Sequence, residues 1–137
     1  MTKWQVWEAL LILTAEGFLA PVSSSETPQE DLRASRNLNR EICRKAESSE
    51  SMNFLAAPKI GAAIPVNRIQ QLFLHATTLE KKKIPDYVWS ILKAQNQNLV
   101  VSNKTLEAPE ENLKKLNEMY NEFTKTVLPV LKKVGAF

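Results

Sequence analysis

Apolar residues recur at intervals of three or four positions along most of this 137-residue chain, and strictly alternating apolar and polar stretches are nearly absent. An interval near 3.6 residues is typical of helices that bury one face, whereas alternation indicates strands. Glycine occurs only at Gly17, Gly61 and Gly135, and the prolines stand where the helical patterns start or stop. The pattern predicts an all-α protein, a compact bundle of about five helices in one domain of residues 1–137.

The first predicted helix covers residues 3–19 and is apolar around most of its circumference. Thr2 and Gln5 match a capping box at its start, in which each side chain binds the backbone amide of the other residue. The apolar side chains are Trp4, Val6, Trp7, Leu10, Leu11, Leu13 and Phe18. Because so much apolar surface is unfavourable in water, we expect this helix to pack against more than one neighbour and to be integral to the fold.

The first 20 residues also resemble a secretory signal in part, because one basic residue, Lys3, precedes the apolar run 9–13. Glu8 and Glu16 interrupt the apolar stretch, and no small-x-small cleavage site follows it. The same acids argue against a membrane span, which needs about 20 apolar residues. We therefore expect an intracellular protein, cytoplasmic or nuclear. A secreted or virion-associated protein that loses these residues as a cleaved leader is the alternative.

A strong helix start follows at residues 27–30, whose sequence Thr-Pro-Gln-Glu combines an N-cap residue, a proline at the first helical position and a capping-box acid. The second predicted helix runs from there to about residue 47. Its apolar side consists of Leu32, Leu38, Ile42 and Ala46. Residues 48–66 contain two prolines and a glycine, which predict a long irregular connection with at most one helical turn near residues 52–57.

Two further helices are predicted at residues 66–82 and 85–99. The third helix ends on three lysines, whose charge suits the negative end of a helix dipole. Pro85 restarts the chain as the fourth helix. We expect the core faces to consist of Val66, Ile69, Leu72, Phe73, Ala76 and Leu79 in the third helix and of Ile84, Val88, Ile91, Leu92 and Leu99 in the fourth.

A fifth predicted helix begins at Pro109 and carries a heptad stripe, a row of apolar residues at alternating steps of three and four. The stripe consists of Leu113, Leu116, Tyr120, Phe123, Val127, Val130 and Val134. Pro129 interrupts the stripe, because proline removes a backbone donor and bends a helix. We expect the residues before Pro129 to belong to the protein's own core. We expect the segment after it, with Val130, Val134 and Phe137, to dock on another chain.

Charge and cysteine content narrow the function classes. The formal net charge is +3, with 7 basic and 8 acidic residues in positions 1–60 and 11 basic and 7 acidic residues in positions 61–137. This surplus is smaller than the dense cluster of basic residues found in proteins that bind mainly phosphate backbones. The single cysteine, Cys43, cannot form an intramolecular disulfide, so we expect it to be a buried apolar residue of a protein from a reducing compartment.

Residues with catalytic chemistry are scarce. Cys43 and His75 are the only thiol and the only imidazole, and neither stands in a catalytic motif. Glu118 and Glu122 are four positions apart, but the flanking lysines make surface ion pairs the simpler interpretation. The glycosylation sequon at Asn103 lies in a predicted turn and matters only in a secreted protein. We therefore expect no enzymatic activity, no cofactor, no metal site and no small-molecule substrate.

The second predicted helix carries an arginine face, defined here as Arg33, Arg36, Arg40 and Arg44, which fall within an arc of about 80° opposite the apolar side. Guanidinium groups bind carboxylates and phosphates through planar, forked hydrogen bonds. The face is therefore a candidate surface for an acidic protein or a nucleic-acid backbone. The simpler alternative is an exposed helix face with local ion pairs such as Glu30–Arg33 and Glu41–Arg44.

Trp89 points away from the apolar face of the fourth predicted helix and lies one turn from Lys93. A tryptophan in that position is either packed by a crossing loop or an anchor for a partner, since tryptophan is enriched among binding hot spots. These features together favour a non-enzymatic helical subunit or adaptor that contacts other protein chains within a larger assembly. The alternative is a nucleic-acid-associated protein that uses the arginine face.

Overall fold

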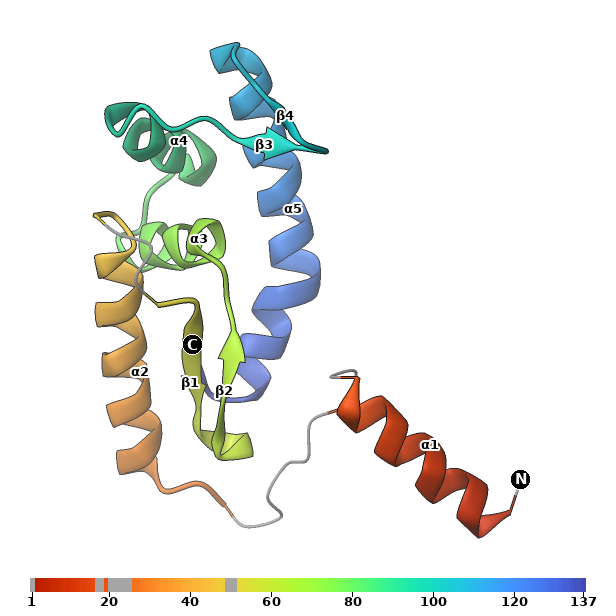
Figure 1. The fold of residues 1–137 in the computed structure, drawn as a ribbon. Coiled ribbons are helices and arrows are strands. Elements are labelled where there is room, and N and C mark those ends of the chain that lie inside the picture. Colours follow the sequence, from red (N-terminus) through yellow and green to blue (C-terminus); the bar gives the residue numbers. More distant parts are fainter. Residues whose placement is uncertain (1, 17–18, 20–25, 49–51) are drawn as a thin grey trace.

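The structure, a computed structural model, describes residues 2–16, 19, 26–48 and 52–137. Its helices are α1 (Lys3–Ala15), α2 (Gln29–Lys45), α3 (Arg68–Thr78), α4 (Ile84–Ala94) and α5 (Pro109–Lys133). Two antiparallel hairpins accompany them, β1 (Phe54–Ala57) with β2 (Ala62–Pro65) and β3 (Val100–Val101) with β4 (Lys104–Thr105). The described residues are therefore mainly helical, but not all-α as the sequence pattern predicted (Figure 1).

The β1–β2 hairpin corrects the prediction of an irregular connection over residues 48–66. Leu55 and Ala57 of β1 face inward and are buried. The 3-10 turn Pro58–Ile60 joins the strands, and Gly61 completes it with a φ of 61°, a left-handed conformation that glycine adopts without strain. The sequence pattern missed this hairpin because each four-residue strand contains two alanines and few of the β-branched or aromatic residues that favour strands.

Asn39 of α2 fixes the hairpin to the helix. Its side-chain oxygen accepts a hydrogen bond of 2.8 Å from the backbone N–H of Ala56. Its side-chain nitrogen donates to the carbonyl oxygens of Ala56 and Ala136, each at 2.8 Å. Asn39 is only 3% exposed, whereas Leu38, which the sequence analysis placed on the buried side, is 54% exposed. A buried asparagine therefore joins α2, β1 and the segment that follows α5.

The core lies around α3, between α2 and α5 (Figure 1). Phe73 of α3 is fully buried, and its ring centroid lies 5.1 Å from that of Tyr120 and 5.6 Å from that of Phe123 on α5. Leu116 and Phe123 are buried as predicted, while Tyr120 is half-buried. The predicted core residue Leu79 is instead 47% exposed, because α3 ends at Thr78.

The helix ends and the prolines agree only in part with the sequence analysis. The capping box of Thr2 and Gln5 is confirmed at the start of α1. Pro28 occupies the N-cap position of α2 and no side chain caps that helix, so the predicted cap at residues 27–30 is wrong. Helix α5 continues through Pro129 to Lys133, with Val130 exposed and Leu131 buried on successive positions.

The β3–β4 hairpin contains the turn that the sequence analysis expected at the Asn103 sequon. Ser102 and Asn103 form its two-residue turn with φ angles of 50° and 64°. Positive φ at both central positions is characteristic of the tight hairpin turns whose twist matches that of the strands. Asn103, the sequon asparagine, therefore does lie in an exposed turn.

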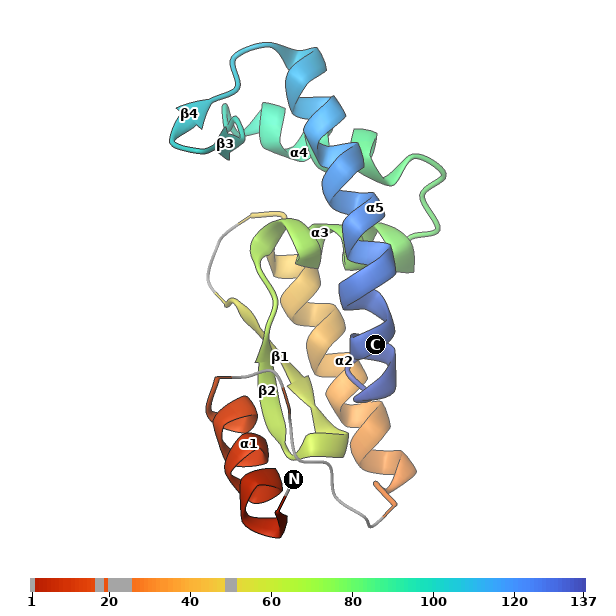
Figure 2. The same ribbon diagram turned by 90° about the vertical axis from the view of Figure 1, so that its right-hand side faces the viewer.

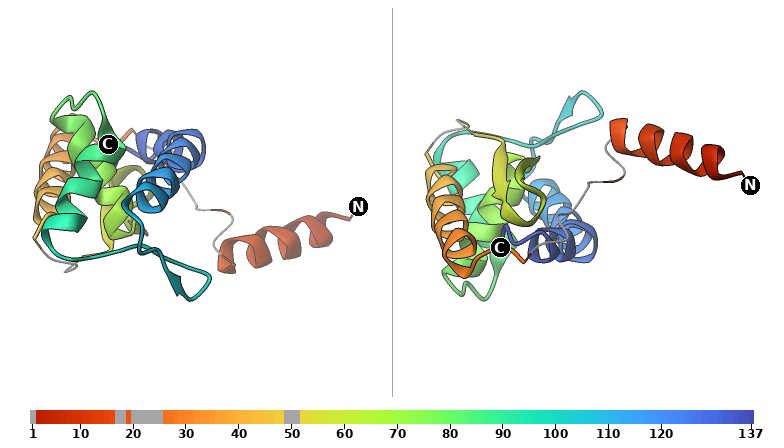
Figure 3. Two further views of the ribbon diagram at one scale, coloured as in Figure 1. Left: turned by 90° about the horizontal axis from the view of Figure 1, so that it is seen from above. Right: turned by 90° about the horizontal axis from the view of Figure 1, so that it is seen from below.

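Helix α1 differs most from expectation, because none of its residues is buried. Trp4 is 83% exposed, Leu11 68% and Trp7 57%. Seen from above and from below, α1 projects from the rest of the chain on the side opposite to α2 (Figure 3). The prediction that α1 packs against several neighbours is therefore wrong.

Candidate binding pocket

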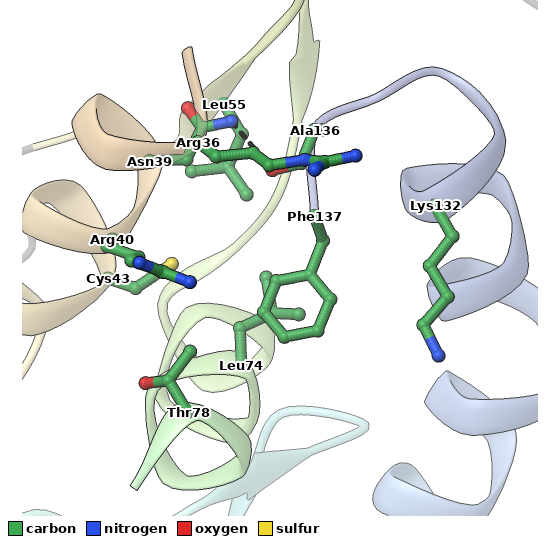
Figure 4. A pocket seen from close by; sticks show the side chains of 10 residues that line it. All are labelled: Arg36, Asn39, Arg40, Cys43, Leu55, Leu74, Thr78, Lys132, Ala136 and Phe137. Carbon is green, nitrogen blue, oxygen red and sulfur yellow. Dashed lines mark hydrogen bonds between the residues drawn. The ribbon is translucent and has the colours of Figure 1, made fainter. Parts of the chain in front are cut away.

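A pocket of about 340 Å³ lies where α2, β1 and α3 meet the end of α5 and the segment after it (Figure 4). Three of the residues predicted to bind a partner, Arg36, Arg40 and Phe137, converge in it. The residues that line it are Arg36, Asn39, Arg40, Cys43, Leu55, Leu74, Thr78, Lys132, Ala136 and Phe137.

The floor of the pocket is apolar. Leu55, Leu74 and Ala136 are each 1% exposed, and the half-buried ring of Phe137 lies between the α2 side chains and Lys132 (Figure 4). Gly135 allows the chain to turn from α5 into this floor, since its φ is +80° and an added Cβ would lie 2.8 Å from a side-chain carbon of Leu32. The hydrogen bond from Asn39 then holds Ala136 in place.

The rim of the pocket is cationic. Arg36 and Arg40 stand one turn apart on α2, and Lys132 approaches from α5 (Figure 4). All three residues are exposed, and none forms an ion pair with a carboxylate of the described residues. Elsewhere on the surface, Arg44 pairs with Glu41 at 2.8 Å, which is one of the local ion pairs that the simpler alternative expected. Within the described part of the chain, no carboxylate therefore neutralises the three pocket cations.

The pocket also contains a thiol and a hydroxyl group. Cys43 is buried as predicted, and burial raises the pKa of its thiol to about 12, which keeps the weakly nucleophilic neutral form at physiological pH. The hydroxyl of Thr78 donates a hydrogen bond of 2.7 Å to the carbonyl oxygen of His75. The arrangement can bind a ligand through charge and apolar contact, but it offers no activated nucleophile.

The structure brings together only part of the predicted partner-binding set. Arg36, Arg40 and Phe137 converge at the pocket. Arg33 is exposed on α2 but does not line the pocket, and Arg44 is engaged by Glu41. Sequence reasoning missed Lys132, Leu55 and Leu74, because they come from three different elements and only the tertiary structure places them beside α2.

The other predicted partner-binding residues lie apart from the pocket lining. Val130 is 53% exposed, whereas Val134 is half-buried and its carbonyl accepts a hydrogen bond of 3.3 Å from the N–H of Lys59. Trp89 and Lys93 do lie side by side, in a separate depression of about 260 Å³. Trp89 is half-buried and packs against the core.

A second polar cluster forms around Glu47, just after α2. His75 Nε2 lies 3.2 Å from Glu47 Oε1, and the hydroxyl of Tyr87 donates to the same oxygen. Burial and then the contact with Glu47 raise the pKa of Tyr87 to about 12, so the phenol stays protonated as a donor. The cluster joins α2 to α3 and α4. Among the described residues, no group of three His, Cys, Asp or Glu side chains could hold a metal ion.

Comparison with known proteins yields one informative similarity. The chain is 33% identical over 135 residues to a Synechocystis protein named "Uncharacterized protein sll1526"; the match covers 98% of this chain and 26% of the relative. The chain thus spans about a quarter of that relative's length. No protein-family model matches the chain, and no solved structure does. Within the described residues, no helix is long and apolar enough to span a membrane.

Proposed function

We propose that this protein is a non-enzymatic interaction domain that binds other protein chains within a larger assembly, and that the pocket is its binding site. One observation carries the proposal: three cations with no partner among the described carboxylates surround an apolar floor. A segment that fits must bring carboxylates next to an apolar or aromatic side chain. The match to one quarter of a longer relative supports a role as one part of a larger protein or complex.

The chemistry of the rim explains the preference for acidic protein segments. Arg36 and Arg40 can each bind a carboxylate with a forked pair of charge-assisted hydrogen bonds. Arginine also stacks on aromatic rings, so a tryptophan or tyrosine of the partner gains cation–π attraction beside the floor. The volume of about 340 Å³ is near the lower end of the ligand-pocket range, about 300–1,000 Å³, which suits one or two anchoring side chains.

Binding of labelled peptides to the full chain tests the proposal. Fluorescein-labelled peptides that place glutamate beside tryptophan or leucine should bind, and peptides with glutamine in place of glutamate should bind much more weakly. Arg40→Glu or Lys132→Glu should weaken binding about tenfold, which corresponds to about 1.4 kcal/mol. Fluorescence anisotropy measures both affinities.

Matched controls are available on the same helices. Arg33→Glu and Lys133→Glu make the same charge change at exposed positions that do not line the pocket, and they should leave affinity within about twofold, as expected for screened surface charges. Equal binding of the acidic and neutral peptides, or equal losses in the pocket and control variants, would contradict the proposal. Tighter binding to a DNA or RNA duplex than to any acidic peptide, with a steep salt dependence, would favour the nucleic-acid alternative.

A further inference from the structure

The outward surface of α1 has the composition of a binding epitope. Trp4, Trp7, Glu8 and Leu11 fall within an arc of about 100° on the helix, and we call them the tryptophan face. The two indoles and Leu11 are among its most exposed apolar side chains, at 83%, 57% and 68%. Tryptophan is enriched among the residues that dominate binding energy, and so much exposed apolar surface is typical of an interaction site.

The tryptophan face is complementary to the pocket. It joins aromatic and aliphatic side chains to one carboxylate, Glu8, while the pocket joins an apolar floor to Arg36, Arg40 and Lys132. An indole placed on the floor would lie next to the guanidinium groups, where cation–π attraction adds to burial. Glu8, one turn from Trp4, would then reach the cationic rim. This is the acidic and aromatic chemistry that the proposed function assigns to a ligand.

No residue of α1 lines the pocket of its own molecule. α1 projects from the side away from α2, which contributes Arg36 and Arg40 to the pocket (Figure 3). In the perpendicular view, the β1–β2 hairpin lies between α1 and the C-terminal end (Figure 2). A neighbouring molecule can therefore supply the helix that fills the pocket.

We propose that the tryptophan face of one copy docks in the pocket of a second copy, and that reciprocal exchange of the two helices closes a two-fold dimer. The inference rests on the proposed function, because the same pocket is the receptor. In a reciprocal exchange both α1 helices are bound and both pockets are filled. A one-way contact would leave one helix and one pocket free, so further copies could add and form filaments. Four exchanged tryptophans bury on the order of 600–1,000 Å², and the opposing pocket surfaces bring the total into the range of specific interfaces, about 1,200–2,000 Å².

A lipid surface fits α1 less well than a protein does. Helices that lie in a membrane interface have a strongly polar face rich in lysine and arginine opposite an apolar one. α1 is apolar on nearly all sides, and Lys3 is its only basic residue. Vesicles are therefore a competing outcome in the test and not the proposed partner.

Sedimentation velocity of the full chain between about 1 and 200 µM, concentrations that bracket the dissociation constants of weak dimers, tests the proposal. The wild-type chain should move toward twice its mass of 15.5 kDa as concentration rises. Glu8→Arg and Arg40→Glu should each sediment as monomers, because each substitution should weaken the affinity of the dimer at least tenfold. Both residues are exposed, so circular dichroism and melting of these variants should match the wild type.

Mixing experiments show which surfaces meet. An equimolar mixture of the Glu8→Arg and Arg40→Glu chains should form a heterodimer. The unchanged helix of the Arg40→Glu chain can bind the unchanged pocket of the Glu8→Arg chain. The double variant should regain the homodimer, because the charge pair is reversed and not removed. Glu16→Lys and Arg33→Glu are matched controls outside the tryptophan face and the pocket, and both should dimerise like the wild type.

Each outcome bears on the inference. A wild-type chain that stays monomeric, a dimer that neither variant weakens, or a mixture that fails to associate would overturn it. So would a monomer whose tryptophan fluorescence shifts only on adding phosphatidylcholine–phosphatidylserine vesicles. If the chain is monomeric yet Arg40-dependent peptide binding is observed, the proposed function stands and the exchange fails. If the Arg40-dependent dimer forms but no acidic peptide binds, the exchange stands and the part of the proposed function that fails is the binding of partners other than a second copy.

Discussion

Replacing Asn39 with alanine should test how the pocket is held together. The side chain makes three hydrogen bonds of 2.8 Å and is only 3% exposed, so its loss leaves three backbone groups of Ala56 and Ala136 without this partner. A buried hydrogen bond contributes about 1 kcal/mol net, and we expect Asn39→Ala to lower the free energy of unfolding by about 3 kcal/mol. In a domain of this size the corresponding fall in Tm is about 10 °C.

Urea unfolding followed by circular dichroism at 222 nm measures this loss. Asn37→Ala is a matched control, since Asn37 is exposed on the same helix, and it should change stability by less than about 0.5 kcal/mol. Asn39→Asp keeps the acceptor for the N–H of Ala56 but loses both donated bonds, so it should also destabilise the fold. If Asn39→Ala is no more destabilising than Asn37→Ala, the asparagine does not join α2, β1 and the C-terminal segment as described.

Further predictions concern α1, the core, the thiol and the turn into the pocket. A chain lacking residues 1–25 should unfold as cooperatively as the full chain, because no residue of α1 is buried; a broad transition in calorimetry would contradict this. Phe123→Ala should cost about 3–5 kcal/mol in urea unfolding, whereas Val130→Ala at an exposed position should cost less than about 0.5 kcal/mol. At pH 9, Cys43 should react with iodoacetamide far more slowly in the native chain than in the urea-unfolded chain. Burial raises the pKa of the native thiol to about 12, so little thiolate is present at pH 9. Equal rates would refute the burial of Cys43. Gly135→Ala should lower Tm, because residue 135 has a φ of +80° and the added Cβ would lie 2.8 Å from a side-chain carbon of Leu32. An unchanged Tm would show that this turn is not constrained.

The helical part of the fold could be predicted from the sequence because its signal is local. The apolar faces that contain Leu72, Phe73 and Phe123 follow the helical period, and all three residues are buried. The exposure of Arg36 and Arg40 follows from the same period. The pattern fails where a polar residue occupies a buried position of the helix. Asn39, and not Leu38, faces inward, because the side-chain amide of Asn39 binds backbone groups that lie far away in the sequence.

The hairpin, the pocket and the surroundings of α1 could not be predicted, for different physical reasons. The β1–β2 strands are short and alanine-rich, and contacts with α2 stabilise them. The pocket depends on Leu74 and Lys132, which are distant in sequence from Arg40 and carry no local signal of their own. The sequence identifies α1 as an apolar helix, but its apolar composition does not specify whether its own chain or another molecule covers it.

A nuclear magnetic resonance titration tests the central claim most directly. The full, ¹⁵N-labelled chain is titrated with a peptide that places glutamate beside tryptophan, and the amide shifts are mapped onto the structure. We expect the largest shifts at Arg40, Leu74, Ala136 and Phe137, the residues that form the rim and the floor of the pocket. Shifts concentrated instead around Trp89 and Lys93, or no saturable shifts at all, would contradict the account.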